Sequence, residues 1–110
     1  MRAGLVYFMQ TFNRMLKKRR FEKDNVVKVT FELPADTARE TIRLVGEFNG
    51  WEGTRLERQK DGCWKTTVAL DPDREYEFRY LVDDERWLND PQADGYRVNP
   101  FGEDNSIVTT

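Results

Sequence analysis

The sequence predicts an all-β protein, an antiparallel β-sandwich that follows a short N-terminal α-helix. From residue 26 onward, apolar side chains alternate with polar ones over several short segments, which is the period of a strand with one buried face. Turn-forming residues separate these segments at intervals of about ten residues, and no helical pattern occurs after residue 25. Short strands at this spacing are typical of two packed antiparallel sheets.

Residues 1–25 form a separate N-terminal arm that is expected to hold the helix. The apolar side chains that recur there at helical spacing are Leu5, Phe8, Met9, Phe12, Met15 and Leu16. A basic run, residues 17–20, follows them, and basic side chains are favourable near the C-terminal end of a helix. A signal peptide is not expected, because the charges follow the apolar part instead of preceding it. We therefore expect a basic amphipathic helix over residues 1–20.

Three interpretations of this arm remain open. In the first, residues 1–20 dock on the rest of the chain, on a protein partner or on a second copy through self-association. In the second, the basic amphipathic helix contacts an anionic membrane surface. In the third, the segment partly reflects the choice of start site, and Met15 begins the natural protein.

Residues 26–110 form the β-sandwich domain. Its strands are expected at residues 27–33, 41–47, 64–70, 76–82 and 107–108. The first strand alternates from Val27 to Leu33 and ends at Pro34, since proline lacks the backbone N–H that a sheet uses. Asp61-Gly62 is a hairpin signal ahead of the third strand. Residues 88–104 are rich in Asn, Asp, Pro and Gly, so we expect an ordered loop with little regular structure there.

The composition excludes several classes of catalytic and metal site. The chain has no histidine and one cysteine, Cys63. Catalytic triads that use histidine and zinc sites that use imidazole therefore cannot form within it. A single cysteine cannot form an internal disulfide, so we expect an inert thiol and a cytoplasmic location. No cofactor and no metal site are expected.

Charge is distributed unevenly along the chain. Residues 1–25 carry seven basic and two acidic side chains, a net charge of +5, whereas residues 26–110 carry eleven and eighteen, a net charge of −7. A phosphate backbone is attracted by a basic surface, and the larger part of this chain is acidic. Nucleic acid is therefore not an expected partner.

Two tryptophans and one arginine stand where neighbouring strands end. Asn49-Gly50 is a turn pair, and it places Trp51 directly after the second expected strand. Trp87 lies beyond the strand that ends at Val82, and Arg79 occupies an outward position in that strand. These side chains would form a platform for a flat, neutral, hydroxyl-rich ligand, which means a sugar. In the alternative interpretation both tryptophans belong to the core.

Four fragments along residues 26–110 resemble one known family. They are Gly46-Glu47-Phe48-Asn49-Gly50-Trp51, then Tyr76 to Asp83, then Trp87 with Asn89-Asp90-Pro91, and last Asn99-Pro100-Phe101-Gly102 with Asn105 and Ile107. In this order and spacing they resemble carbohydrate-binding module family 48. That family includes the glycogen-binding domain of the AMP-activated protein kinase beta subunit and the early-set domains of isoamylases and glycogen-branching enzymes. The chain looks most like small stand-alone bacterial members.

The resemblance implies an immunoglobulin-like early-set sandwich that binds α-1,4-glucans such as glycogen and starch without cleaving them. It implies that Trp51 and Trp87 stack on glucose rings and that Arg79 stands where the family usually has lysine. Phe101 matches an apolar residue that packs against the glucan, and Asn105 matches an asparagine that bonds sugar hydroxyls.

The sequence also departs from the family at two positions. Glu103 stands where the kinase beta subunit has threonine, and Asp84 stands where a turn glycine is common. The first departure means that the contact made by this threonine is not expected here, and an aspartate can occupy such a turn.

Two other function classes compete with sugar binding. Catalysis by paired carboxylates is not expected, because Asp71/Asp73 and Asp83/Asp84 lie at turns, where acidic side chains usually cap the backbone or face solvent. The stronger rival is a protein–protein interaction or structural early-set module that has lost sugar binding. Exposure of Trp51 and Trp87 on one face beside Arg79 would favour the sugar; burial of both would favour the rival.

Overall fold

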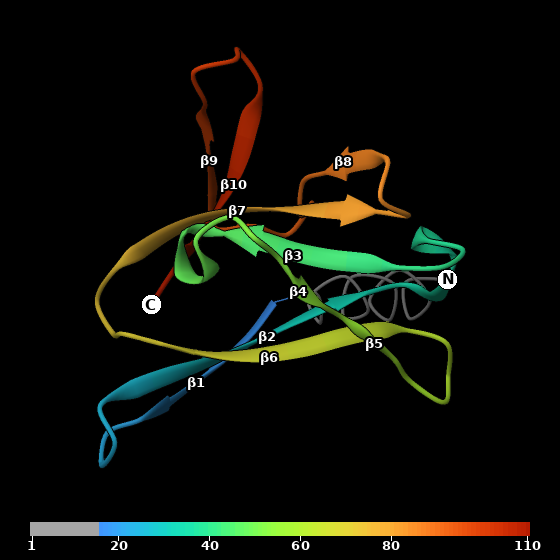
Figure 1. Ribbon diagram of the computed structural model, residues 1–110. Helices are drawn as coiled ribbons and strands as arrows, with labels where there is room; N and C mark the ends of the chain where they lie inside the picture. Colours follow the sequence, from blue (N-terminus) through green and yellow to red (C-terminus); the bar gives the residue numbers. More distant parts are fainter. Residues whose placement is uncertain (1–15) are drawn as a thin grey trace, which may run out of the picture.

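In the computed structural model, which describes residues 16–110, two antiparallel sheets face each other across an apolar core (Figure 1). The first sheet has the strand order β1-β2-β6-β5, and the second has the order β4-β3-β7-β10-β9, with β8 paired to β7. The strands of the first sheet are β1 (Leu16–Phe21), β2 (Val26–Leu33), β5 (Glu57–Arg58) and β6 (Trp64–Leu70). Those of the second are β3 (Ile42–Gly46), β4 (Thr54–Arg55), β7 (Glu75–Val82), β8 (Arg86–Leu88), β9 (Gly95–Val98) and β10 (Asp104–Thr109). The predicted all-β, antiparallel architecture is confirmed.

Aromatic side chains join the two sheets in the core. Phe31 of β2 packs edge-on against Phe78 of β7, with ring centroids 5.1 Å apart, and Tyr80 lies 5.6 Å beyond Phe78. Trp64 is also buried, so one of the three tryptophans belongs to the core. Burial of a large apolar side chain contributes about 1.5–3 kcal/mol, which makes this cluster a main source of the stability of the sandwich.

The prediction of a helix over residues 1–20 is wrong for residues 16–20. These residues belong to β1, which pairs with β2 from Leu16 opposite Phe31 to Phe21 opposite Val26. Residues 1–15, the rest of the expected helix, lie outside the described residues. The β1–β2 hairpin also crosses residue 25, the predicted boundary between the arm and the sandwich.

Strand alternation explains why the basic run adopts this structure. Lys18 and Arg20 share one face of β1 and form ion pairs with Asp94 and Asp73. The two basic residues next to them point to the opposite face. Pairing along β2 also satisfies the backbone hydrogen-bonding groups on one edge of β1. Of the apolar residues that carry the helical spacing, Leu16 lies in the described part of the chain, and it belongs to β1.

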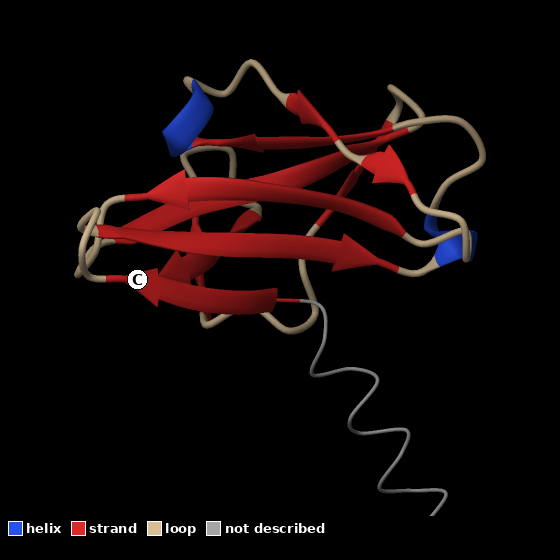
Figure 2. Cartoon of the chain, turned by 90° about the horizontal axis from the view of Figure 1, so that it is seen from below, coloured by secondary structure: helices blue, strands red, loops and turns tan. Residues whose placement is uncertain are grey.

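Two short 3-10 turns lie at opposite ends of the sandwich (Figure 2). They are η1 (Ala35–Thr37), which precedes β3, and η2 (Glu47–Asn49), which follows it. Within residues 16–110 no helix is long and apolar enough to cross a membrane.

Residues 88–104 hold more regular structure than the sequence predicts. Residues 95–98 form β9, which pairs with β10 from Gly95 opposite Ile107 to Val98 opposite Asp104. Most side chains of β9 are exposed, and this strand of four residues lies within a segment rich in turn-forming residues. The short alternation of Tyr96 and Val98 therefore does not distinguish it from a loop. The β9–β10 hairpin extends beyond β7 (Figure 1), and its tip holds residues 99–103.

A buried aspartate ties this segment to the core. Asp90 is fully buried, and its carboxylate accepts a hydrogen bond from the Tyr80 hydroxyl at 2.7 Å and from the Gln92 backbone N–H at 2.8 Å. The Asp90 backbone N–H donates to the Ser106 hydroxyl oxygen at 2.9 Å, and the Tyr96 hydroxyl donates to its carbonyl oxygen at 2.6 Å. Burial raises the pKa of Asp90, although the bond from Tyr80 opposes this shift. Asp90 therefore links β7, β9 and β10 at one point.

Asp83 joins the turn after β7 to the segment that leads into β3. Its carboxylate accepts hydrogen bonds from the backbone N–H groups of Arg39, Glu40 and Thr41, at 3.0, 2.7 and 3.0 Å. These bonds favour the charged form and lower the pKa of Asp83 from 3.8 to about 2. Because folding lowers this pKa, the charged carboxylate stabilises the folded chain, and the stabilisation is lost as the pH falls through the folded pKa.

We expect the difference in unfolding free energy between the native chain and Asp83→Asn to shrink as the pH falls from about 4 to about 2. At neutral pH the native chain is the more stable of the two, since asparagine offers one acceptor oxygen where aspartate offers two. Urea denaturation over this pH range measures the difference. Asp24→Asn, at an exposed turn position, is the control. A difference between native and Asp83→Asn chains that stays constant with pH would contradict the role assigned to Asp83.

Candidate functional site

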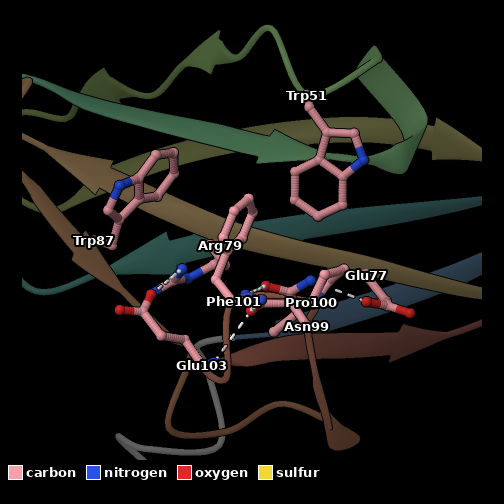
Figure 3. Close-up of a pocket in the computed structure, with 9 residues that line it drawn as sticks. Trp51, Glu77, Arg79, Trp87, Asn99, Pro100, Phe101 and Glu103 are labelled. Atoms are coloured by element: carbon pink, nitrogen blue, oxygen red, sulfur yellow. Dashed lines mark hydrogen bonds and ion pairs between the residues drawn. The ribbon is translucent and has the colours of Figure 1, made fainter.

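A groove of about 600 Å³ lies on the outer face of the second sheet (Figure 3). The residues that line it are Trp51, Glu77, Arg79, Trp87, Asn99, Pro100, Phe101, Glu103 and Asn105. All five residues that the sequence predicted for the site are among them. The structure therefore brings together side chains from the turn after β3, from β7, from β8 and from the β9–β10 hairpin.

Strand β7 forms the base of this groove. Phe78 and Tyr80 point into the core, so the alternating residues Glu77 and Arg79 point outward. One edge of β7 pairs with β3, and the other edge pairs first with β10 and then with β8. Because β8 and β10 pair with the same edge of β7, Trp87, which pairs with Leu81, lies close to the N-terminal end of β10.

Trp51 is held at the rim by an unusual backbone conformation. The Asn49 side chain closes the preceding turn, accepting from the Gly46 N–H at 3.0 Å and donating to the Leu44 carbonyl at 2.8 Å. Gly50 and Trp51 then both have positive φ, 64° and 63°. Left-handed backbone costs a residue with a side chain roughly 1–2 kcal/mol. The indole is nevertheless 43% exposed, so burial of the ring does not explain the strain.

Glycine tolerates this backbone conformation, so Trp51→Gly is expected to be more stable than Trp51→Ala by about 0.5–1 kcal/mol. Trp87 has no positive φ and lies in a strand, where glycine is unfavourable, so Trp87→Gly should be less stable than Trp87→Ala. Urea denaturation of the four variants measures both differences. A Trp51→Gly chain that is no more stable than Trp51→Ala would show that the Trp51 backbone carries no strain.

Trp87 and Arg79 form one unit on the opposite side of the groove. Trp87 is 48% exposed, and the Arg79 guanidinium lies 5.2 Å from the centre of its ring. Arg79 Nη1 donates a hydrogen bond to the Glu103 carboxylate at 3.0 Å. The Arg79 Nε atom is buried and has no hydrogen-bond partner among the described residues. In Figure 3 the indole rings of Trp51 and Trp87 lie on either side, with Phe101 and Arg79 between them.

Asn99 organises the loop that carries Phe101. Its side-chain oxygen accepts from the backbone N–H groups of Phe101 at 2.9 Å and Glu103 at 3.1 Å. Its backbone N–H donates to the Glu103 carbonyl at 2.6 Å. Phe101 stands at the tip of this tight loop and is 90% exposed. The loop thus presents an apolar ring to solvent at the edge of the groove.

Asn105 is more enclosed than its predicted role requires. It is 7% exposed, donates to Glu77 Oε1 at 3.0 Å and accepts from the Asn99 amide at 3.2 Å. Arg97 Nη1 donates to the other oxygen of Glu77 at 3.1 Å. The bond from Asn105 is the main cause that lowers the pKa of Glu77, and Arg97 adds to it. Asn105 thus lines the groove with an amide that already has partners on both of its polar atoms.

Four lining residues were absent from the predicted site. Glu77 could have been found, because it shares the outward face of β7 with Arg79. Asn99 and Pro100 belong to a turn whose sequence resembles the family but carries no implied role. Glu103 is a departure from the family in sequence, and its contact with Arg79 spans 24 residues of chain, so no local pattern predicts it.

The groove has the character of a binding surface. Its rims are aromatic, and its base holds hydrogen-bonding groups already ordered by one another. Neither acidic pair that catalysis would need lines it: Asp71 and Asp73 lie in the turn before β7, and Asp83 caps backbone N–H groups. In the described part of the chain, no cluster of His, Cys, Asp and Glu could hold a metal ion.

Comparison with known proteins gives one family match. Residues 19–93 match the family described as carbohydrate-binding module 48 (isoamylase N-terminal domain). No curated protein matches the chain in sequence.

Solved structures share the fold. Ferric enterobactin esterase from Salmonella typhimurium superposes with a TM-score of 0.68 at 12% identity, covering 86% of this chain and 34% of its own, which shows the fold alone. Pullulanase from Anoxybacillus sp. LM18-11, complexed with maltotetraose, has a TM-score of 0.55 at 26% identity over 91% of this chain and 15% of its own. Pullulanase from Bacillus acidopullulyticus gives 0.54 at 18% identity, over 86% and 12%. The chain thus spans about a third of the esterase and under a sixth of each pullulanase.

Proposed function

The chain belongs to the carbohydrate-binding module 48 family, and we propose that its groove binds α-1,4-glucan, as in glycogen, starch or maltooligosaccharides, without cleaving it. The family is one of non-catalytic binding modules, and two of the similar structures are pullulanases. Two of the similar structures are complexed with maltotetraose and maltotriose, which supports a glucan ligand. The immunoglobulin-like, early-set assignment of the sandwich is part of this proposal.

One observation carries the proposal: two exposed tryptophans lie on the same groove as Arg79. A glucose ring has an apolar C–H face that packs on an aromatic ring, while its hydroxyls need donors and acceptors at the edge. Trp51 and Trp87 provide the aromatic rings, and Arg79 and Glu103 provide the hydrogen-bond donors and acceptors. The rival interpretation needed both tryptophans to be buried, and neither is.

Binding at this groove is expected to be weak for one oligosaccharide. Covering about 100 Å² of apolar surface per stacked ring contributes on the order of 2.5 kcal/mol. Rigid-body and ordering losses offset much of the sum of two such contacts. We therefore expect a Kd between about 1 µM and 1 mM, strengthened on a polymer that offers many sites.

Native gel electrophoresis with polysaccharide in the gel tests the proposal. The native chain should migrate more slowly in gels that contain amylose or glycogen than in plain gels. Dextran, an α-1,6-linked glucose polymer, is the control for linkage. Unchanged mobility with amylose and glycogen would contradict glucan binding, and equal retardation by dextran would contradict the α-1,4 preference.

A further inference from the structure

Glu103 lines the groove and forms an ion pair with Arg79, the one basic residue of the lining. Its carboxylate accepts a hydrogen bond from Arg79 at 3.0 Å, while the rest of its side chain faces solvent, 62% exposed. The Arg79 side chain is 15% exposed and lies between this carboxylate and the Trp87 ring. The Glu103 backbone is fixed on both sides by Asn99. The loop therefore fixes the backbone of Glu103 at a position from which its carboxylate reaches Arg79.

Each charged side chain that lines the groove is already paired with one of opposite charge. Of its nine lining residues, Glu77 and Glu103 are acidic, and Arg79 is the one basic side chain. Glu77 is met by Asn105 and by Arg97 from outside the lining. Arg79 is met by Glu103, so the one cation of the lining is already neutralised. A ligand in this groove therefore meets no unpaired cation among the lining residues.

We propose that Glu103 restricts the groove to uncharged sugar chains and excludes sugars that carry phosphate or carboxylate groups. This specificity rests on the glucan binding proposed above. A neutral sugar can donate one hydroxyl to Glu103 and accept at another hydroxyl from a free N–H of Arg79, so the ion pair stays intact. An anionic group must instead displace Glu103 from Arg79 and lie beside its carboxylate.

Without Glu103, the same groove would favour the opposite ligands. Arg79 would present an unpaired planar guanidinium beside an aromatic ring, an arrangement that binds phosphate and carboxylate groups in bidentate fashion. The choice between the two ligand classes thus depends on one side chain in the tip of the β9–β10 hairpin.

Calorimetric titration with maltoheptaose and with maltoheptaose 6-phosphate tests this specificity. The quantity measured is the Kd for maltoheptaose 6-phosphate divided by the Kd for maltoheptaose. It is compared between the native chain and Glu103→Gln, which keeps the size of the side chain and removes its charge. We expect this ratio to be greater than one in the native chain. Glu103→Gln should lower it by about tenfold, as expected for one charge acting over a few ångströms in a partly exposed site. Glu57→Gln, on the exposed β5 strand of the other sheet, makes the same change in net charge away from the groove.

Each outcome of this titration decides the proposal. A lower ratio in Glu103→Gln with an unchanged ratio in Glu57→Gln supports it, as does weaker discrimination by the native chain at about 0.5 M NaCl, where charges are screened. An equal ratio in the native chain and Glu103→Gln overturns the specificity and leaves glucan binding intact. An equal shift in both variants shows that net charge acts instead of Glu103. Failure of the native chain to bind maltoheptaose overturns the proposed function and this specificity together.

Discussion

Alanine at Trp51 or at Trp87 is expected to weaken retention on amylose and glycogen by at least tenfold. Each substitution removes one stacking surface, worth on the order of 2 kcal/mol, and about 1.4 kcal/mol corresponds to a tenfold change in Kd. Both indoles are about half exposed, so their removal leaves the core unchanged. Loss of both rings together should abolish retention, because the remaining polar contacts do not offset the cost of ordering the ligand.

Phe21→Ala is the matched control for these two variants. Phe21 is an aromatic residue of β1 in the first sheet, outside the groove. Its removal should leave retention unchanged. Urea denaturation of each variant shows whether the fold persists. Full retention by folded Trp51→Ala and Trp87→Ala chains would contradict the aromatic platform and direct attention to another surface.

Asp90→Ala is expected to lower the free energy of unfolding by about 2–4 kcal/mol, well beyond the effect of removing an exposed polar side chain. The substitution leaves the fully buried hydroxyl of Tyr80 without its acceptor and removes the acceptor of the Gln92 N–H. The Tyr80 hydroxyl is fully buried and the Gln92 N–H is partly buried, and a buried group without a partner costs about 1–3 kcal/mol. Part of this loss is offset, since a carboxylate with a raised pKa is itself unfavourably buried.

A double-mutant cycle with Tyr80→Phe separates these contributions. Tyr80→Phe removes the donor, so Asp90→Ala should cost less in that background than in the native chain, by about 1 kcal/mol or more. Urea denaturation of the four proteins gives the coupling free energy. Strict additivity would show that the 2.7 Å contact between Tyr80 and Asp90 does not stabilise the fold.

The long central strands could be predicted from the sequence because one face of each is buried. Residues 64–70 and 76–82 alternate cleanly, and the structure places β6 at Trp64–Leu70 and β7 at Glu75–Val82. β1 and β9 could not be found in this way. β1 consists mostly of exposed basic residues, and β9 has three exposed side chains of four. Their order comes from backbone pairing with β2 and β10, which no local pattern reveals.

The residues of the candidate site also divide into those that the sequence pattern reveals and those that only the assembled sheets reveal. Trp51, Trp87 and Arg79 could be placed near one another because each stands at an identifiable turn or outward strand position. The enclosure of Asn105 and the pairing of Glu103 with Arg79 depend on how the β9–β10 hairpin approaches β7. Contacts of this kind join residues distant in sequence, so they appear only once the sheets are assembled.

The indole N–H signals of the three tryptophans offer the most direct test that a glucan occupies this groove. In ¹H–¹⁵N spectra of the labelled chain titrated with maltoheptaose, the signals of Trp51 and Trp87 should move together with one Kd. The signal of Trp64 should stay in place, because Trp64 is buried in the core and its N–H faces the Ala35 carbonyl. Stationary signals from Trp51 and Trp87 at saturating sugar, or shifts confined to residues of the first sheet, would contradict the account.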